Sequence, residues 1–103
     1  MPTPHMPTLS VRRALEKLGA DIYDARKRRK LSAQVVADRA FTSRKTLHRI
    51  ERGDFAVSIG IYASVLHALS VLDNLSEVAD VRNDEIGLTL MSDAQKRDAL
   101  ARR

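Results

Sequence analysis

The densest group of chemically active side chains in this sequence is basic and lies between residues 44 and 52. It consists of Arg44, Lys45, His48, Arg49 and Arg52. Leu47 and Ile50, three positions apart, predict a helix with one narrow buried face and a basic remainder. Burying such cations is costly, whereas on an exposed helix they are the residue types that contact phosphates and purine edges in a DNA major groove. The segment therefore predicts a helix that contacts nucleic acid.

Capping residues mark the elements that must position this helix. Ser32 and Ser43 stand where a side-chain oxygen can accept from the free N–H groups of a following helix. Gly53 stands where a helix needs a left-handed residue to end. The first of the two helices has an inner face made of Val35, Val36, Ala37 and Ala40. Two short helices joined by a tight turn are a helix-turn-helix.

Residues 31–53 resemble the helix-turn-helix of the λ-repressor-like (Xre) family. The matching pattern is Leu-Ser, Val-Ala, Thr-Ser-Arg-Lys-Thr-Leu and Arg-Ile-Glu-Arg-Gly, in order and spacing, and the likeness extends from about Leu18 to Leu75. The chain departs from the family at two positions. Ala33, followed by Gln34, stands where the family has Gln, and Phe41 stands where it has Gly. Because a positive φ is unfavourable for an aromatic residue, the turn must either tolerate that strain at Phe41 or follow a slightly altered path, and we expect the altered path.

The resemblance and the residue types together imply roles for several polar residues in and just before the motif. Base edges would be read by Arg44, Lys45, His48 and Arg49, with arginine as the usual bidentate reader of guanine. Phosphates would be bound by Ser32, Gln34, Ser43, Arg52, Arg28 and Lys30. Arg26 and Glu51 would form an ion pair that joins the first helix of the domain to the end of the reading helix. The plainer alternatives are a solvated basic face, and a Glu51 that only offsets its basic neighbours.

Length, charge and residue composition limit what kind of protein this chain can be. A chain of 103 residues, 44% hydrophobic, is large enough for one small core. Its net charge of +5 is uneven, because residues 1–60 carry +7 and residues 61–103 carry −2. Without cysteine, a signal peptide or an apolar run of membrane-spanning length, we expect a cytoplasmic protein with no membrane partner. The scattered His5, His48 and His67 predict no metal site, and nothing predicts a cofactor or an enzyme.

The rest of the chain divides into three parts. Residues 1–9, rich in proline, are expected to be a disordered arm, residues 10–80 the DNA-binding domain, and residues 81–103 a strand and a flexible tail. In Glu85–Met91, the alternation of Ile86, Leu88 and Leu90 predicts a strand, which would pair with its symmetry mate and make a homodimer. The alternative is a strand packed on its own domain. From Ser92, a capping box to Gln95 begins a segment expected to be disordered or to fold on a partner.

The fold class expected is therefore all-α: a five-helix λ-repressor-like domain with a short C-terminal β-strand. The segments after the motif, residues 62–75 and 79–88, further resemble HipB-like antitoxins. This resemblance implies a dimeric repressor that binds a palindromic operator in double-stranded DNA, regulates its own operon and holds a HipA-like kinase toxin. Two alternatives remain open, a solitary phage-type repressor and a protein-interaction adaptor without DNA binding.

Overall fold

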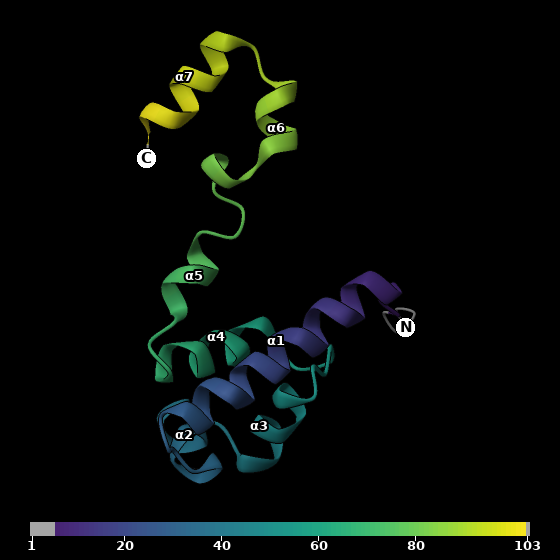
Figure 1. The fold of residues 1–103 in the computed structure, drawn as a ribbon, viewed down its shortest axis with the longest axis vertical. Coiled ribbons are helices and arrows are strands. Elements are labelled where there is room, and N and C mark those ends of the chain that lie inside the picture. Colours follow the sequence, from purple (N-terminus) through teal and green to yellow (C-terminus); the bar gives the residue numbers. More distant parts are fainter. Residues whose placement is uncertain (1–5, 103) are drawn as a thin grey trace. The chain divides into compact units, whose positions relative to one another are not determined.

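The computed structural model describes residues 6–102, and all regular structure in that range is helical (Figure 1). The all-α prediction is confirmed. The chain divides into two compact units, Met1–Leu72 and Asp73–Arg103. Most of the predicted N-terminal arm, residues 1–5, lies outside the described residues; Thr8 already caps the first helix, accepting from the N–H of Val11 at 3.4 Å. Within residues 6–102 no helix has both the length and the apolarity needed to cross a bilayer.

The first unit contains four helices around one core. They are α1 (Leu9–Arg28), α2 (Ala33–Arg39), α3 (Arg44–Glu51) and α4 (Ile59–Ala68). Both α1 and α2 pack on α3, and α2 also packs on α4. The largest fully buried side chains come from all four helices and from the residue that ends α4: Ile22, Val36, Leu47, Ile50, Val65 and Leu69. Ile59, the first residue of α4, is 73% exposed and takes no part in this core.

Serine caps begin three of these helices. The hydroxyl oxygens of Ser32, Ser43 and Ser58 accept from backbone N–H groups three residues further on, at 3.1, 3.0 and 3.3 Å. Each bond satisfies one of the N–H groups that a helix leaves without a partner in its first turn. The predicted starts of α2 and α3 are therefore confirmed.

The same stop signal ends all four helices. One residue adopts a left-handed conformation, and its N–H and that of the following residue both donate back to carbonyls of the last turn. In α3 the N–H of Gly53 donates to the carbonyl of Ile50 at 2.9 Å, and that of Asp54 donates to Arg49 at 3.0 Å. The left-handed residues, with their φ values, are Lys30 (54°), Phe41 (57°), Gly53 (76°) and Ser70 (64°).

The expectation of an altered turn at Phe41 is wrong. Phe41 keeps the positive φ of 57° that glycine would adopt there. Its N–H donates to the carbonyl of Asp38 at 3.2 Å, and the N–H of Thr42 donates to Ala37 at 3.0 Å. Only a left-handed residue allows both hydrogen bonds. Phe41 is 96% exposed, so its ring points into solvent and does not clash with the core. The backbone therefore tolerates local strain to end α2.

Two glycines let α1 lie directly against the end of α3. A Cβ atom on Gly19 would come within 2.5 Å of the carbonyl oxygen of Ile50, and one on Gly53 within 2.6 Å of the backbone of Glu16. Gly19 thus occupies the middle of a helix because backbone approaches backbone at this point. The contact fixes the C-terminal end of α3 relative to α1.

The second unit is built from short helices. It comprises most of α5 (Leu72–Ser76), then the 3₁₀ turn η1 (Val81–Asn83), α6 (Glu85–Leu90) and α7 (Asp93–Ala101), with α6 and α7 both packed on η1. The side chain of Asp80, 1% exposed, accepts from Arg82 Nε at 3.1 Å.

The predicted strand at Glu85–Met91 is wrong, because residues 85–90 form α6. Asp84 caps this helix, accepting from the N–H of Gly87 at 3.0 Å. Ile86 and Leu90, four residues apart, share one helix face and are 77% and 80% exposed, whereas Leu88 is half-buried. The sequence pattern fits both periods over so few residues, and the cap favours the helix. An intermolecular β-ribbon therefore has no strand from which to form.

The last helix begins at the predicted capping box. Ser92 Oγ accepts from the N–H of Gln95 at 3.2 Å, and the Gln95 side chain accepts from the N–H of Ser92 at 2.9 Å. Residues 93–101, expected to be disordered or to fold only on a partner, form α7 within the chain and bury Ala99.

Candidate nucleic-acid interface

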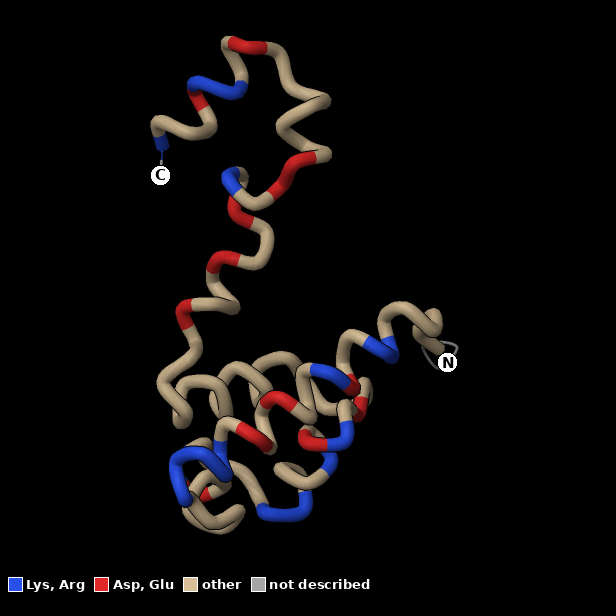
Figure 2. The backbone as a smooth tube through the Cα atoms, viewed as in Figure 1, with Lys and Arg blue, Asp and Glu red and all other residues tan. Residues whose placement is uncertain are grey.

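Helix α3 has one buried face and one polar face. Leu47 and Ile50 are fully buried, whereas Arg44, Lys45 and His48 are exposed. At 100° per residue, Lys45 and His48 lie on the side away from the two buried residues. In Figure 2 basic residues mark the start of α3 and, separately, the C-terminal end of α1. An exposed helix with a basic outer surface is suited to contact a polyanion.

Arg49, one of the predicted base readers, is hydrogen-bonded to an acidic residue outside α3. Its Nε donates to Asp54 Oδ2 at 2.7 Å, and the two side chains are 37% and 29% exposed. The hydrogen bond from Arg49, together with that from the N–H of Ala56, lowers the pKa of Asp54. Sequence reasoning missed Asp54. The available signal was an acid directly after Gly53, where the reversal of the chain returns it to the last turn of α3.

Arg26 and Glu51 form the predicted ion pair, which is buried between α1 and α3. Arg26 Nε donates to Glu51 Oε2 at 2.8 Å and its Nη2 donates to Oε1 at 3.2 Å, which makes the pair bidentate. Their side chains are 7% and 6% exposed. The hydrogen bond to Glu51 raises the pKa of Arg26, and Nη1 donates to the carbonyl of Leu31 at 3.2 Å. The ion pair joins α3 to α1, and the bond to Leu31 joins both to the segment just before α2.

His48 touches the same buried carboxylate from the exposed side. Its Nδ1 lies 3.5 Å from Glu51 Oε1, and its side chain is 47% exposed. The imidazole is therefore held at the boundary between the ion pair and the outer face of α3.

The predicted phosphate-binding residues are mostly exposed but differ in how free they are. Ser32 uses its oxygen to cap α2 and keeps its O–H for a further bond, whereas Ser43 Oγ also donates to Thr46 Oγ1 at 3.0 Å. Gln34 Nε2 donates to Asp38 Oδ1 at 2.8 Å. The remaining candidates are exposed cations at the ends of α1 and α3: Arg28, Lys30 and Arg52. Ser43 is thus less available than Ser32.

The charge imbalance follows the division into units. Residues 61–72 contain no acidic residue, lysine or arginine, so the net charge of +7 belongs to the first unit and −2 to residues 73–103. The excess positive charge of the chain is therefore a property of the first unit.

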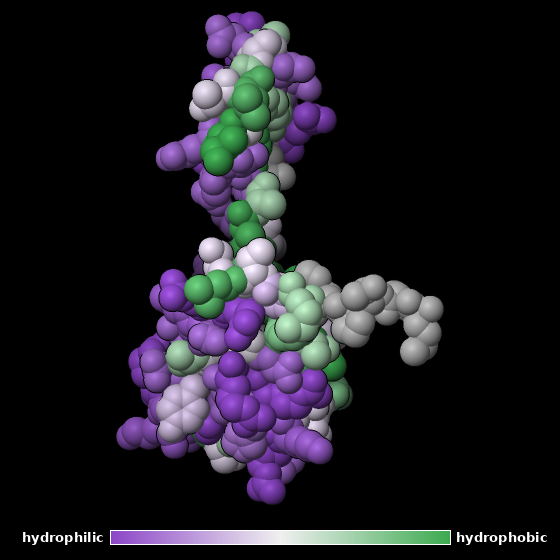
Figure 3. Space-filling model, turned by 90° about the vertical axis from the view of Figure 1, so that its right-hand side faces the viewer, coloured by the Kyte–Doolittle hydropathy of each residue, from purple (hydrophilic) through white to green (hydrophobic). Residues whose placement is uncertain are grey.

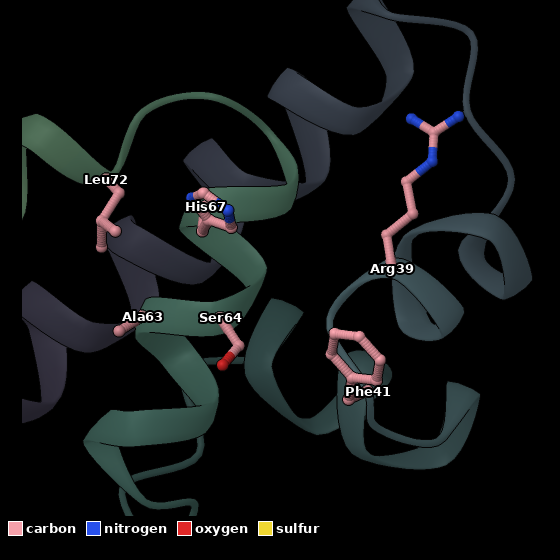
Figure 4. Close-up of a pocket in the computed structure, with 6 residues that line it drawn as sticks. All are labelled: Arg39, Phe41, Ala63, Ser64, His67 and Leu72. Atoms are coloured by element: carbon pink, nitrogen blue, oxygen red, sulfur yellow. The ribbon is translucent and has the colours of Figure 1, made fainter.

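An open pocket of about 350 Å³ lies on another part of this unit. Figure 4 shows its lining side chains, which come from the end of α2, the turn after it, α4 and the start of α5: Arg39, Phe41, Ala63, Ser64, His67 and Leu72. No residue of α3 lines it. Across residues 6–102, no three His, Cys, Asp or Glu side chains gather closely enough to hold a metal ion.

Comparisons with known proteins give no family for this chain. No family model, curated protein or solved structure matches it. The case for a function therefore depends on the residues of the first unit and their geometry.

Proposed function

We propose that this protein binds double-stranded DNA through a helix-turn-helix formed by α2 and α3, with α3 as the reading helix. The observation that carries the proposal is the division of α3 into a buried face of Leu47 and Ile50 and an exposed face with Lys45 and His48, in a unit of net charge +7. The short turn after α2 and the serine caps match what such a motif requires.

In this proposal the contacts divide into two classes. Base edges are read by Arg44, Lys45, His48 and Arg49, which belong to α3. Backbone phosphates are bound by Ser32, Gln34, Arg28, Lys30 and Arg52, with Ser43 as a weaker member because Thr46 already takes its hydroxyl proton. The buried Arg26–Glu51 pair does not contact DNA. It holds the end of α3 in its orientation against α1.

We further propose that the protein acts as a homodimeric, cytoplasmic repressor of its own operon, as its resemblance to HipB-like antitoxins implies. A palindromic operator requires two reading helices related by a two-fold axis. The second unit offers surface for partners because Val78, Ile86 and Leu90 are at least 70% exposed. Figure 3 shows hydrophobic side chains at the surface of that unit.

Salt-dependent duplex binding tests the DNA proposal directly. Titrating a fluorescent duplex pool with the full chain at increasing salt should give a slope of about −5 to −9 for the logarithm of the binding constant against the logarithm of the salt concentration, if a dimer places 6–10 cations on phosphates.

Two substitutions separate base reading from phosphate binding. Arg44→Ala should cost about 1–3 kcal/mol of binding free energy at one base position, whereas Arg52→Ala should weaken binding to all sequences alike. Arg97→Ala removes the same charge from the exposed surface of α7 and should change neither the base preference nor the overall DNA affinity. A slope near zero would favour the adaptor alternative.

The toxin partner needs a separate experiment. Co-expression with the product of a neighbouring kinase-like gene, followed by purification through a tag on this chain, should recover both proteins in a fixed ratio. Recovery of this chain alone, together with salt-dependent duplex binding, would instead indicate the solitary repressor.

A further inference from the structure

A residue outside α3 holds the side chain of Arg49 in place on the outer face of that helix by a hydrogen bond. Arg49 Nε donates to Asp54 Oδ2 at 2.7 Å. Asp54 reaches this position because Gly53 reverses the chain, so that the N–H of Asp54 also donates to the carbonyl of Arg49 at 3.0 Å. Arg49 and Asp54 are thus linked twice, by one hydrogen bond between their side chains and one between their backbones.

Asp54 is itself held from three directions. Its Oδ1 accepts from the N–H of Ala56 at 2.8 Å, and its carbonyl accepts from Tyr62 Oη at 2.7 Å. Tyr62 belongs to α4 and is 5% exposed, so this bond anchors the loop to the core. The pKa of Asp54 is lowered, first by the bond from Arg49, so the carboxylate is charged at neutral pH. The acceptor that holds Arg49 is therefore both rigid and ionised.

This arrangement leaves one edge of the guanidinium available. A guanidinium can bind the O6 and N7 of guanine either through Nε and one Nη or through its two Nη groups. With Nε occupied, only the second mode remains. Among residues 6–102 neither Nη group of Arg49 has a hydrogen-bond partner, and 37% of the side chain is exposed.

We propose that Asp54 is a positioning residue for base recognition: it holds Arg49 by Nε so that the two Nη groups face a guanine edge. The inference rests on the proposed DNA-binding function and deepens it by naming a base and the residue that orients its reader. A flexible arginine loses rotamer freedom when it binds, whereas one already held by a fixed carboxylate loses less. Asp54 would therefore raise discrimination without touching DNA.

Selection from a randomised duplex pool, followed by sequencing, tests the proposal with the full chain. The wild-type protein should prefer guanine at one position of each half-site. Asp54→Asn should reduce that preference about 10-fold, the size expected when a bidentate contact loses its geometry. Arg49→Ala should remove the same preference, because both Nη donors are lost. Asp21→Asn removes an equal charge from an exposed ion pair on α1 and should leave all preferences unchanged.

A double variant separates positioning from a purely structural role. In an Arg49→Ala background, Asp54→Asn should cause no further change at that position, and binding to unrelated duplexes should stay equal or increase because a negative charge is lost. If Asp54→Asn lowers discrimination equally with and without Arg49, or if Asp54→Asn alone keeps the full guanine preference, the inference is wrong although the protein still binds DNA. A wild-type protein without duplex affinity would overturn the proposed function and this inference together.

Discussion

A single left-handed residue ends each of the first four helices, and only one of the four is glycine. Lys30, Phe41 and Ser70 adopt positive φ values although each carries a Cβ. The left-handed conformation costs an L-residue roughly 1–2 kcal/mol, partly offset by the smaller entropy that a non-glycine residue loses on folding. Phe41 bears this cost most clearly, because its ring is 96% exposed and gains almost nothing from packing.

Phe41→Gly should therefore stabilise the protein by about 0.5–1 kcal/mol. The left-handed turn is kept, the conflict at Cβ disappears, and little buried area is lost. Urea unfolding followed by circular dichroism measures the change. Lys27→Gly is the control, because it places glycine at an exposed position inside α1 and should destabilise by about 1 kcal/mol. A loss of stability in Phe41→Gly would show that the ring has a packing role in solution.

The Arg26–Glu51 pair makes a different contribution at the residue scale. Both side chains are less than 10% exposed, so removing one leaves an uncompensated buried charge. Arg26→Ala or Glu51→Ala should each cost on the order of 3 kcal/mol in the free energy of unfolding. Replacing both by apolar residues, Arg26→Met with Glu51→Leu, should cost less than the two single losses added together.

An exposed ion pair in the same chain provides the comparison. Lys17 and Asp21 lie on α1 with Nζ 2.6 Å from Oδ2, but their side chains are 77% and 56% exposed. Lys17→Ala should therefore cost no more than about 1 kcal/mol. Strictly additive losses at Arg26 and Glu51 in a double-mutant cycle would mean that the two residues do not interact.

At the scale of elements, the contact between α1 and the end of α3 depends on the absence of a side chain. Gly19→Ala should destabilise the protein by at least about 2 kcal/mol, because its Cβ would meet the backbone carbonyl of Ile50, which cannot move without shifting α3. Gly60→Ala is the matched control. Its Cβ would meet only Ser58 Oγ at 3.9 Å, so alanine should stabilise α4 by up to about 1 kcal/mol. Equal effects at both positions would contradict this account of the interface.

The elements also show what the sequence can and cannot predict. The starts of α2, α3 and α7 were predictable because serine caps act within three residues of the chain. The nature of residues 85–90 was not, because Ile86, Leu88 and Leu90 fit a strand, while Ile86 and Leu90 also fit a helix face. Periodicity over six residues cannot separate the two, and the deciding cap, Asp84, lies before the alternating residues.

The candidate site was predictable where the motif is local and not where the chain folds back. The basic face of α3 follows from the spacing of Leu47 and Ile50. The partner of Arg49 does not, because Asp54 comes beside it only through the left-handed turn at Gly53 and the anchor from Tyr62. A sequence pattern records which residues are present but not which of them a turn returns to the helix.

At the scale of the whole molecule, net charge is divided between the two units, whereas both expose apolar side chains. The first carries +7, and the second carries −2 together with exposed apolar residues on α6. This division suits a protein that contacts DNA with one unit and another protein with the other. A strand ribbon is excluded as the dimer contact, so the apolar face of α6 is the proposed replacement.

The dimer proposal predicts that Ile86→Ser combined with Leu90→Ser shifts the protein toward monomer in sedimentation equilibrium. Both side chains lie on one face of α6 and are at least 77% exposed, so their loss should remove apolar contact between protomers without disturbing the fold of either. Affinity for a palindromic duplex should fall about 10–100-fold, because one bound half-site no longer holds the second protomer nearby.

Leu88→Pro would not serve this purpose, because proline would disrupt α6 whether or not the helix forms an interface. The informative control is Ile59→Ser, which removes an exposed isoleucine, 73% accessible, from the first unit. It should leave both the dimer and the DNA affinity intact. If Ile59→Ser produces monomer while the α6 variant stays dimeric, the two-fold contact lies at the start of α4. The two reading helices would then be related by contacts within the DNA-binding unit, and the surface of α6 would remain available for a different protein.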